Sequence, residues 1–245
     1  MADGIIDRNS GEPYVHRSWC YTELMFRGEV TQTRMLRLFP RWLQVGYTRT
    51  MLAALMFNPR PARIGIVGLG GGAQVKFCHH HLPFSKVAVV ENHPGVLALR
   101  SAFRIPPDDE RLSIELGDGA VWLDANRNSF DLLLIDAYDV NGIPPALSSR
   151  AFYRSCAAAL TPNGVMASNL YATDTALHVS RLKEAFAGRV YMLAEPKQEN
   201  AVVFAWRGAQ RNTDAKQALG ALPRLARLQL FAPMHRLKSG LASLD

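Results

Sequence analysis

A glycine-rich turn between a short apolar segment and a predicted helix is the feature that most constrains the fold of this chain. Residues 64–67 (Ile-Gly-Ile-Val) lead into Gly68-Leu-Gly70-Gly71-Gly72, followed by Ala, which satisfies the pattern G-x-G-x-x-G/A. Glycines at these positions let the backbone turn tightly and approach a ligand, with the N–H groups of the following helix behind it. Because glycine runs also form plain turns, the motif needs support from its surroundings.

The segments after this turn alternate between strand-like and helix-like patterns, which predicts a parallel sheet with helices on both faces. Strands are expected at 63–68, 87–91, 112–116, 131–136, 164–170, 190–193 and 201–206, and helices at 72–81, 94–103, 120–125, 149–160 and 175–186. We therefore expect an α/β domain over residues 59–208.

Two smaller regions flank this domain. Residues 1–58 are expected to hold a loose lead up to residue 13, a β-hairpin at 18–35 and a connecting helix at 42–57, stopped by the prolines that follow. Residues 209–245 are expected to form a helical tail, broken near Pro223 and Pro233.

Four acidic residues follow predicted strands of the α/β domain. Glu91 lies 19 residues after the glycine-rich turn, and Asp118, Asp136 and Asp139 come later. Ligands of open α/β sheets bind beyond the carboxyl ends of the strands, so these side chains are expected to share one crevice. Four carboxylates disfavour a pyrophosphate and therefore a nicotinamide dinucleotide. They suit a ligand with hydroxyls, an amine and positive charge, such as S-adenosylmethionine or its decarboxylated form.

The net charge of +7 in 245 residues is concentrated in the flanks. Seven arginines and one acid lie within residues 27–63, whereas residues 64–208 hold 13 basic and 14 acidic residues. A basic flank can bind nucleic acid, but no nucleic-acid-binding signature accompanies it. We therefore do not expect a nucleic-acid partner, and the Arg-rich segment 27–63 has no assigned role.

Apolar runs are too short to span a membrane, and the N-terminus lacks a signal-peptide pattern. The three cysteines are far apart, so we expect no disulfide framework and a cytoplasmic protein. Three consecutive histidines after Cys78 fan out around a helix and cannot chelate one ion from one face, so no metal site is expected.

Beyond these patterns, the chain resembles the spermidine synthase (polyamine aminopropyltransferase) family over about residues 28–206. The resemblance rests on the glycine-rich turn, on Val-Val-Glu91, on Gly-Asp118-Gly, on Asp136-Ala-Tyr-Asp139 and on the Leu160-Thr-Pro-Asn-Gly segment. It implies the Rossmann-like fold of S-adenosylmethionine-dependent methyltransferases, with a small N-terminal β-hairpin region. It also implies aminopropyl transfer to a small-molecule amine, and a homodimer.

The resemblance implies roles for residues on the donor side. Gln32 and the glycines at 68, 70, 71 and 72 would border the nucleoside and the sulfur. Glu91 would bind the ribose, where a carboxylate can accept hydrogen bonds from both hydroxyls, and Asp118, with Gly119 beside it, would bind the adenine amine.

On the acceptor side, the resemblance implies that Asp136 is the catalytic residue and sits beside the reacting amine. Asp139 would hold the distal ammonium of the acceptor, with Tyr47 near it. Tyr138 would either contact the acceptor or simply pack, and these two alternatives stay open.

The chain departs from the family pattern at several positions. Gly71 stands where the family has an aspartate that holds the amine of the decarboxylated donor, Thr48 replaces a histidine, and His93 replaces an acid. The segment that lines the family's polyamine pocket is not matched at 196–201. Three functions are therefore carried forward: an aminopropyltransferase using decarboxylated S-adenosylmethionine, a methyltransferase using S-adenosylmethionine, and a non-enzymatic nucleoside-binding homologue.

Overall fold

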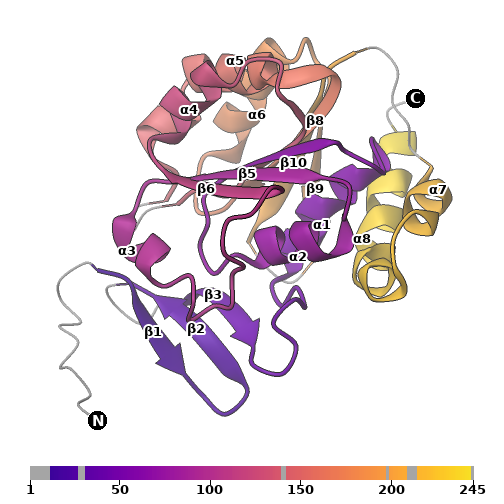
Figure 1. Cartoon of the computed structure of the whole chain (residues 1–245). Coiled ribbons are helices and arrows are strands. Elements are labelled where there is room, and N and C mark those ends of the chain that lie inside the picture. The colour runs from indigo at the N-terminus through magenta and orange to yellow at the C-terminus, as the bar shows by residue number, and fades with distance from the viewer. Residues whose placement is uncertain (1–11, 27–30, 139–141, 197–198, 209–213, 244–245) are drawn as a thin grey trace.

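The molecule is built around a seven-stranded sheet in the order β6-β5-β4-β7-β8-β10-β9 (Figure 1). The computed structural model describes residues 12–26, 31–138, 142–196, 199–208 and 214–243. The strands of this sheet are β4 Arg63–Val67, β5 Lys86–Glu91, β6 Leu112–Leu116, β7 Phe130–Ile135, β8 Leu160–Leu170, β9 Val190–Ala194 and β10 Ala201–Trp206. The five neighbouring strands β6, β5, β4, β7 and β8 pair in parallel, and β10 is antiparallel to both of its neighbours, β8 and β9.

The strand order reverses between β4 and β7, because the chain moves outward in one direction through β5 and β6 and then returns to the other side of β4. At such a reversal the connections leave a crevice at the carboxyl ends of the strands. The glycine-rich turn follows β4 and Asp136 follows β7, so the topology brings these two segments to the crevice.

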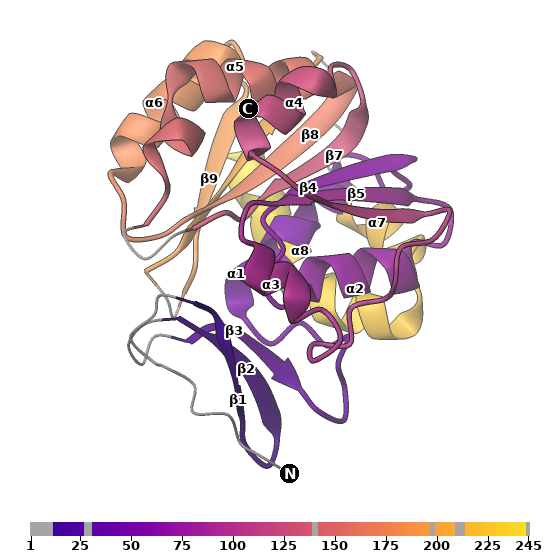
Figure 2. The same ribbon diagram turned by 60° about the vertical axis from the view of Figure 1, so that its left-hand side comes forward.

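Helices cover both faces of the sheet, as the alternating pattern predicts. On one face lie α4 (Gly119–Ala125), α5 (Arg150–Ala159) and α6 (Thr175–Ala185), and on the other lie α1 (Gly46–Leu52), α2 (Ala73–His81) and α8 (Arg224–Ala242) (Figures 1 and 2).

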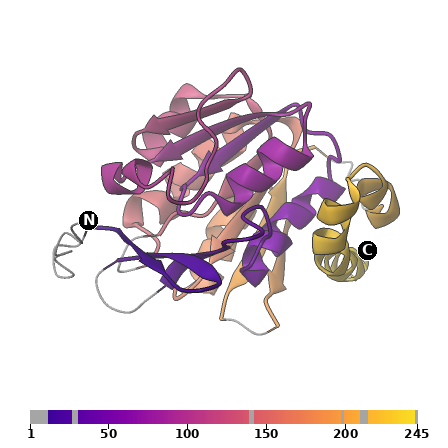
Figure 3. The same cartoon turned by 60° about the horizontal axis from the view of Figure 1, so that its bottom comes forward.

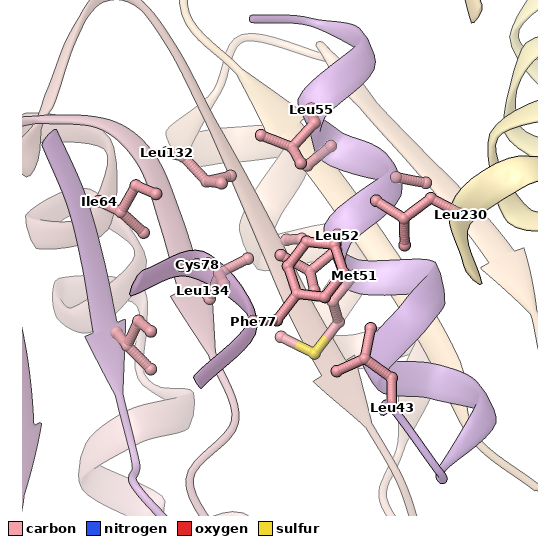
Figure 4. Packing of buried hydrophobic residues seen from close by; sticks show 14 of the residues in the cluster. Leu43, Met51, Leu52, Leu55, Ile64, Phe77, Cys78, Leu132, Leu134 and Leu230 are labelled. Atoms are coloured by element: carbon pink, nitrogen blue, oxygen red, sulfur yellow. The ribbon is translucent and has the colours of Figure 1, made fainter. Parts of the chain in front are cut away.

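Strands β4, β5, β7, β8, β9 and β10 contribute to both cores because successive side chains point to opposite faces. In β7, Leu132 and Leu134 enter the core beneath α1 and α2, whereas Leu133 and Ile135 enter the core beneath α4 to α6. Figure 4 shows the first of these cores, where Leu134 lies near Phe77 of α2 and Leu52 of α1, and Leu230 of α8 lies on the other side of α1.

The N-terminal region forms a three-stranded antiparallel sheet rather than a two-stranded hairpin. Its strands are β1 (Tyr14–Arg17), β2 (Tyr21–Met25) and β3 (Thr31–Leu36), in that order. The hairpin expected at 18–35 corresponds to β2 and β3. The strand β1 was missed because Tyr-Val-His-Arg is short and lacks a clear alternation of apolar and polar residues. Leu24 and Met35 anchor this sheet in the main core.

Three helix predictions need correction. The helix expected at 42–57 is α1 followed by the 3-10 helix η1 (Ala53–Met56), and it begins four residues later than expected. The helix expected at 94–103 is only α3 (Pro94–Ala98) followed by turns.

The third correction concerns the tail. After α7 (Ala215–Gly220) the chain breaks near Pro223 as expected, but Pro233 lies inside α8 and does not end it. Leu230, Met234 and Leu237 of α8 are fully buried in the core that contains α1, and Figure 3 shows α8 beside α1. Tertiary packing of this face outweighs the backbone hydrogen bond that a proline removes from a helix. Within the described residues, no helix is both long and apolar enough to cross a bilayer.

Candidate functional site

The glycine-rich turn adopts a backbone conformation that needs glycine. Gly68, Gly70 and Gly72 have φ of +93°, +50° and +64°, in the region that side chains disfavour. A Cβ at Gly68 would collide with the backbone carbonyl of Asp136, so the ends of β4 and β7 touch at this point. The turn therefore lies directly against the segment that carries the proposed catalytic residue.

Glu91 ends β5 beside this turn and is 8% exposed. Its Oε2 accepts a hydrogen bond from the N–H of Leu69 at 2.8 Å, and its Oε1 accepts one from the N–H of His93 at 2.8 Å. Each carboxylate oxygen has a second lone pair, so these contacts orient the side chain and leave acceptor capacity. The structure places Glu91 beside the glycine-rich turn, and its role toward a ribose stays a prediction.

Asp118 follows β6 and caps α4. Its Oδ1 accepts hydrogen bonds from the N–H groups of Ala120 at 2.8 Å and Val121 at 3.0 Å. Gly119 is buried, and a Cβ there would lie 2.6 Å from Val67 of β4. Asp118 itself is exposed, and both capping hydrogen bonds go to Oδ1; its role toward an adenine amine stays a prediction.

Asp136 is the centre of a hydrogen-bonded cluster at the end of β7. Its Oδ1 accepts a hydrogen bond from Nδ2 of Asn169 at 3.0 Å, and its carboxylate also accepts one from the hydroxyl of Tyr47. Asn169 is held in turn, since its Oδ1 accepts a hydrogen bond from Nδ2 of Asn200 at 2.9 Å. Tyr47 and Asn169 therefore hold the carboxylate directly, and Asn200, just before β10, holds Asn169.

The same surroundings set the protonation of this carboxylate. Burial raises the pKa of Asp136 to about 6, although the hydrogen bonds from Asn169 and Tyr47 lower it. Burial and the neighbouring Asp136 charge also raise the pKa of Tyr47 well above its usual value, so Tyr47 stays a donor. Near neutral pH the carboxylate is ionised yet basic enough to accept a proton, which suits a general base.

Tyr138 lies two residues after Asp136, and its hydroxyl donates a hydrogen bond to the backbone carbonyl of Asn169 at 2.6 Å. Burial raises its pKa, which favours the neutral donor. This contact joins the loop after β7 to β8; whether Tyr138 also contacts an acceptor stays a prediction. Asp139 lies outside the described residues, so its predicted role also stays a prediction.

The N-terminal sheet reaches over the glycine-rich turn through Thr33. The Thr33 methyl group occupies the place of a Cβ at Gly71, and the ring of Phe103 lies 3.0 Å from that place. Gln32 stands just before Thr33 at a bulge in the pairing of β2 and β3, a feature that often redirects side chains near functional sites. The predicted role of Gln32 toward the donor remains untested.

The structure adds Asn169, Asn200 and Thr33 to the residues expected at this site. Asn169 belongs to a motif that resembles the family, but nothing in the sequence indicates that β8 pairs with β7 in the register that brings it to Asp136. Asn200 and Thr33 lie 64 and 103 residues from Asp136 in the chain, and only the packing of distant elements brings them to the site. Within the part of the chain that the structure describes, no group of three or more His, Cys, Asp or Glu is arranged to hold a metal ion.

Comparison with protein families gives an independent result. The spermine/spermidine synthase domain family matches residues 45–189. A polyamine aminopropyltransferase of Chromobacterium violaceum is 33% identical over 182 residues, which cover 73% of this chain and 70% of the relative. A second one, of Neisseria meningitidis serogroup A, is 30% identical over 187 residues, which cover 75% of this chain and 71% of the relative. An eEF1A lysine and N-terminal methyltransferase of Xenopus laevis is 27% identical over 203 residues, 75% of this chain but 29% of that protein.

Solved structures show the same fold. A probable spermidine synthase from Corynebacterium glutamicum aligns with a TM-score of 0.69 at 18% identity, over 87% of this chain and 82% of that one. A spermidine synthase in complex with the transition-state analogue AdoDATO aligns with a TM-score of 0.62 at 20% identity, over 90% and 89%. Human methyltransferase-like protein 13 in complex with SAH aligns with a TM-score of 0.64 at 22% identity, over 78% and 93%. The predicted Rossmann-like, methyltransferase-type fold is thereby confirmed.

Proposed function

The chain belongs to the spermine/spermidine synthase family, and on this basis we propose that it transfers an aminopropyl group from decarboxylated S-adenosylmethionine to an amine acceptor. The observation that carries the proposal is the cluster around Asp136. A half-buried carboxylate with a raised pKa, held by Asn169 and Tyr47, lies against the glycine-rich turn. Such a group can orient a neutral amine and accept its proton.

The reaction needs one displacement. The amine nitrogen attacks the carbon of the propyl group that is attached to the sulfonium, so a C–N bond forms. The C–S bond breaks with its electron pair going to sulfur, which leaves methylthioadenosine. The nitrogen then carries an extra proton, and the carboxylate of Asp136 accepts it. In this scheme Glu91 holds the ribose, Asp118 faces the adenine amine, and Asp139 holds the distal ammonium of the acceptor.

A second candidate function is methyl transfer from S-adenosylmethionine, and Gly71 is the observation that favours it. Without an acid at this position, nothing in the turn repels the carboxylate of S-adenosylmethionine. However, the Thr33 methyl and the Phe103 ring occupy the space beside Gly71, so a carboxylate placed there would lose water without gaining a cation. This packing supports the decarboxylated donor.

Calorimetric titration with each donor separates the two functions. We expect decarboxylated S-adenosylmethionine to bind at least tenfold more tightly than S-adenosylmethionine. The Glu91→Gln variant serves as a site control, because it keeps the shape of the side chain and weakens binding of both donors. Tighter binding of S-adenosylmethionine would reject aminopropyl transfer in favour of methyl transfer.

We further propose a cytoplasmic homodimer. Trp19, Leu38 and Phe39 near the ends of the N-terminal strands are 93%, 86% and 64% exposed, and apolar groups exposed together are typical of contact surfaces. Sedimentation of the wild-type chain and of a Trp19→Ser, Leu38→Ser double variant tests the dimer. A wild-type monomer at micromolar concentration would contradict it.

A further inference from the structure

A second, strongly cationic pocket lies outside the site described above, between the N-terminal sheet and the segment that follows α3. Its volume is about 220 Å³. The lining residues of this arginine pocket are Arg17, Thr22, Met35, Arg37, Ser101, Ala102 and Arg104. In Figure 1 the chain after α3 runs down to the N-terminal sheet at this place.

The fold assembles one wall of the arginine pocket from three strands. Arg17 pairs with Thr22 across β1 and β2, and Thr22 pairs with Met35 across β2 and β3. Directly opposed residues share a face of a sheet, so these side chains form a row, and Arg37 continues it two residues after Met35. Arg104 faces this row from the opposite wall.

The charges of the pocket lack counter-charges within the described residues. No acidic side chain lines it, and the guanidinium groups of Arg17 and Arg104 make neither a hydrogen bond nor an ion pair with any described residue. Arg37 uses only Nη1, which donates to the backbone carbonyls of Ser18 at 3.2 Å and Trp19 at 3.4 Å. By contrast, Arg34 of β3 forms an ion pair with Glu23, with 2.8 Å between Nε and Oε1.

Two buried polar side chains lie in or behind the wall of the pocket. Thr22 is 3% exposed and lines the pocket. Lys76 of α2 lies behind the wall, 3% exposed, with Nζ donating to the carbonyl of Phe103 at 2.8 Å and lying 3.0 Å from Sδ of Met35. Burial, together with the charge of Arg104, lowers the pKa of Lys76 to about 7.

The backbone at Arg104 is held in a conformation that arginine disfavours, with φ of +53°. A glycine would adopt this turn without strain. An arginine here therefore costs local stability and contributes a guanidinium group to the pocket, a combination that is typical of functional positions.

We propose that the arginine pocket binds a phosphate-bearing small molecule, with the guanidinium groups of Arg17, Arg37 and Arg104 and the hydroxyl of Thr22 donating to the phosphate oxygens. Guanidinium forks match phosphate oxygens bidentately, and several together suit a group with more than one negative charge. The volume is below that of sites for whole drug-sized ligands, about 300–1,000 Å³. It therefore fits a diphosphate group, with any remaining part of the ligand outside the pocket.

This site is distinct from the donor site, although both depend on β3. Thr33 covers the glycine-rich turn, and Met35, two residues further on, lines the arginine pocket. The proposal therefore does not depend on the transfer reaction, and it gives part of the Arg-rich segment 27–63 a role.

Titration calorimetry of the full chain with inorganic diphosphate tests the proposal. We expect saturable binding that weakens at least about tenfold in Arg17→Ala and in Arg104→Gly, since hydrogen bonds between charged groups are worth that much or more. Arg104→Gly also relieves the backbone, so its thermal stability should be unchanged or higher. Arg224→Ala on α8 removes one exposed charge elsewhere and should bind diphosphate like the wild type.

The source of the phosphate is read from two further probes. If ADP binds more tightly than diphosphate, and the Arg104→Gly substitution does not change the affinity for adenosine alone, the ligand is a nucleotide. If ADP and diphosphate bind with equal affinity, the ligand is the free anion. Absence of diphosphate binding, or equal binding by Arg17→Ala, Arg104→Gly and the wild type, would overturn the proposal. Displacement of diphosphate by a 20-nucleotide single strand at lower concentration than ADP would also overturn it, in favour of nucleic acid.

Discussion

Asp136 shows how a single side chain acquires its chemistry from three distant parts of the chain. Tyr47 of α1 and Asn169 of β8 donate to its carboxylate, and the glycine-rich turn lies against its backbone. The sequence predicts that Asp136 follows a strand and that it lies at the crevice beyond the carboxyl ends of the sheet. Its partner Asn169 could not, because that contact depends on the register between β7 and β8.

Replacing Asp136 tests its catalytic role. The Asp136→Asn variant keeps the shape of the side chain but cannot accept the proton, so turnover should fall about 10²- to 10⁴-fold. Donor affinity, measured by calorimetry, should change little because Glu91 and the glycine-rich turn are intact. Turnover within threefold of the wild type would remove Asp136 from the mechanism.

The raised pKa of Asp136 also predicts how stability depends on pH. The native state disfavours the ionised form, so the stability present below the unfolded pKa, 3.8, is lost as pH rises through the folded value of about 6. Between about pH 4 and pH 7 the wild type should lose up to roughly 3 kcal/mol of unfolding free energy relative to Asp136→Asn. Urea denaturation of both proteins across this range measures the difference. Parallel pH profiles would show that the pKa is not raised.

At the scale of elements, the contact between β3 and the glycine-rich turn joins the N-terminal sheet to the α/β domain. Gly71 is needed because Thr33 occupies the space of a Cβ. This contact could not be predicted from the sequence, since Thr33 lies in another sheet.

A double-mutant cycle tests this contact. Gly71→Asp should lower stability by about 1–3 kcal/mol through overpacking, and Thr33→Gly in the same chain should recover most of that loss. Thermal or urea unfolding of the four proteins measures the coupling. Additive effects of the two substitutions would mean that Thr33 does not fill this space.

Element boundaries followed the sequence where local signals agree with packing. The strand expected at 201–206 is β10 with identical bounds, and the helix expected at 175–186 is α6 within one residue. The prediction failed at Pro233, where local propensity favours a break but the buried face of α8 continues the helix. It also failed for β1, which is a strand only because β2 is beside it.

At the scale of the whole molecule, α8 belongs to the same core as the sheet rather than to a loose appendage. Leu230 is fully buried against this core, and Oε1 of Gln229 accepts a hydrogen bond from the backbone N–H of Leu43 at 2.8 Å. Leu230 is also seen beside the side chains of α1 in Figure 4.

Two leucines of α8 provide a matched pair of variants. Leu230→Ala should lower the unfolding free energy by about 2–5 kcal/mol because it leaves a cavity, whereas Leu228→Ala, at a position 67% exposed, should change it by less than about 0.5 kcal/mol. Denaturant unfolding measures both. Equal, small effects would show that α8 does not contribute to the main core.

The central claim is that this molecule brings a sulfonium donor and an amine together at Asp136. The most direct measurement incubates the protein with decarboxylated S-adenosylmethionine and, in turn, putrescine, cadaverine and a longer polyamine, and identifies the products by mass spectrometry. We predict that the wild type forms methylthioadenosine together with an equal amount of one aminopropylated amine. The Asp136→Asn variant should form both products only at its reduced rate. Absence of methylthioadenosine with every amine, while calorimetry shows that the donor binds, would contradict the claim.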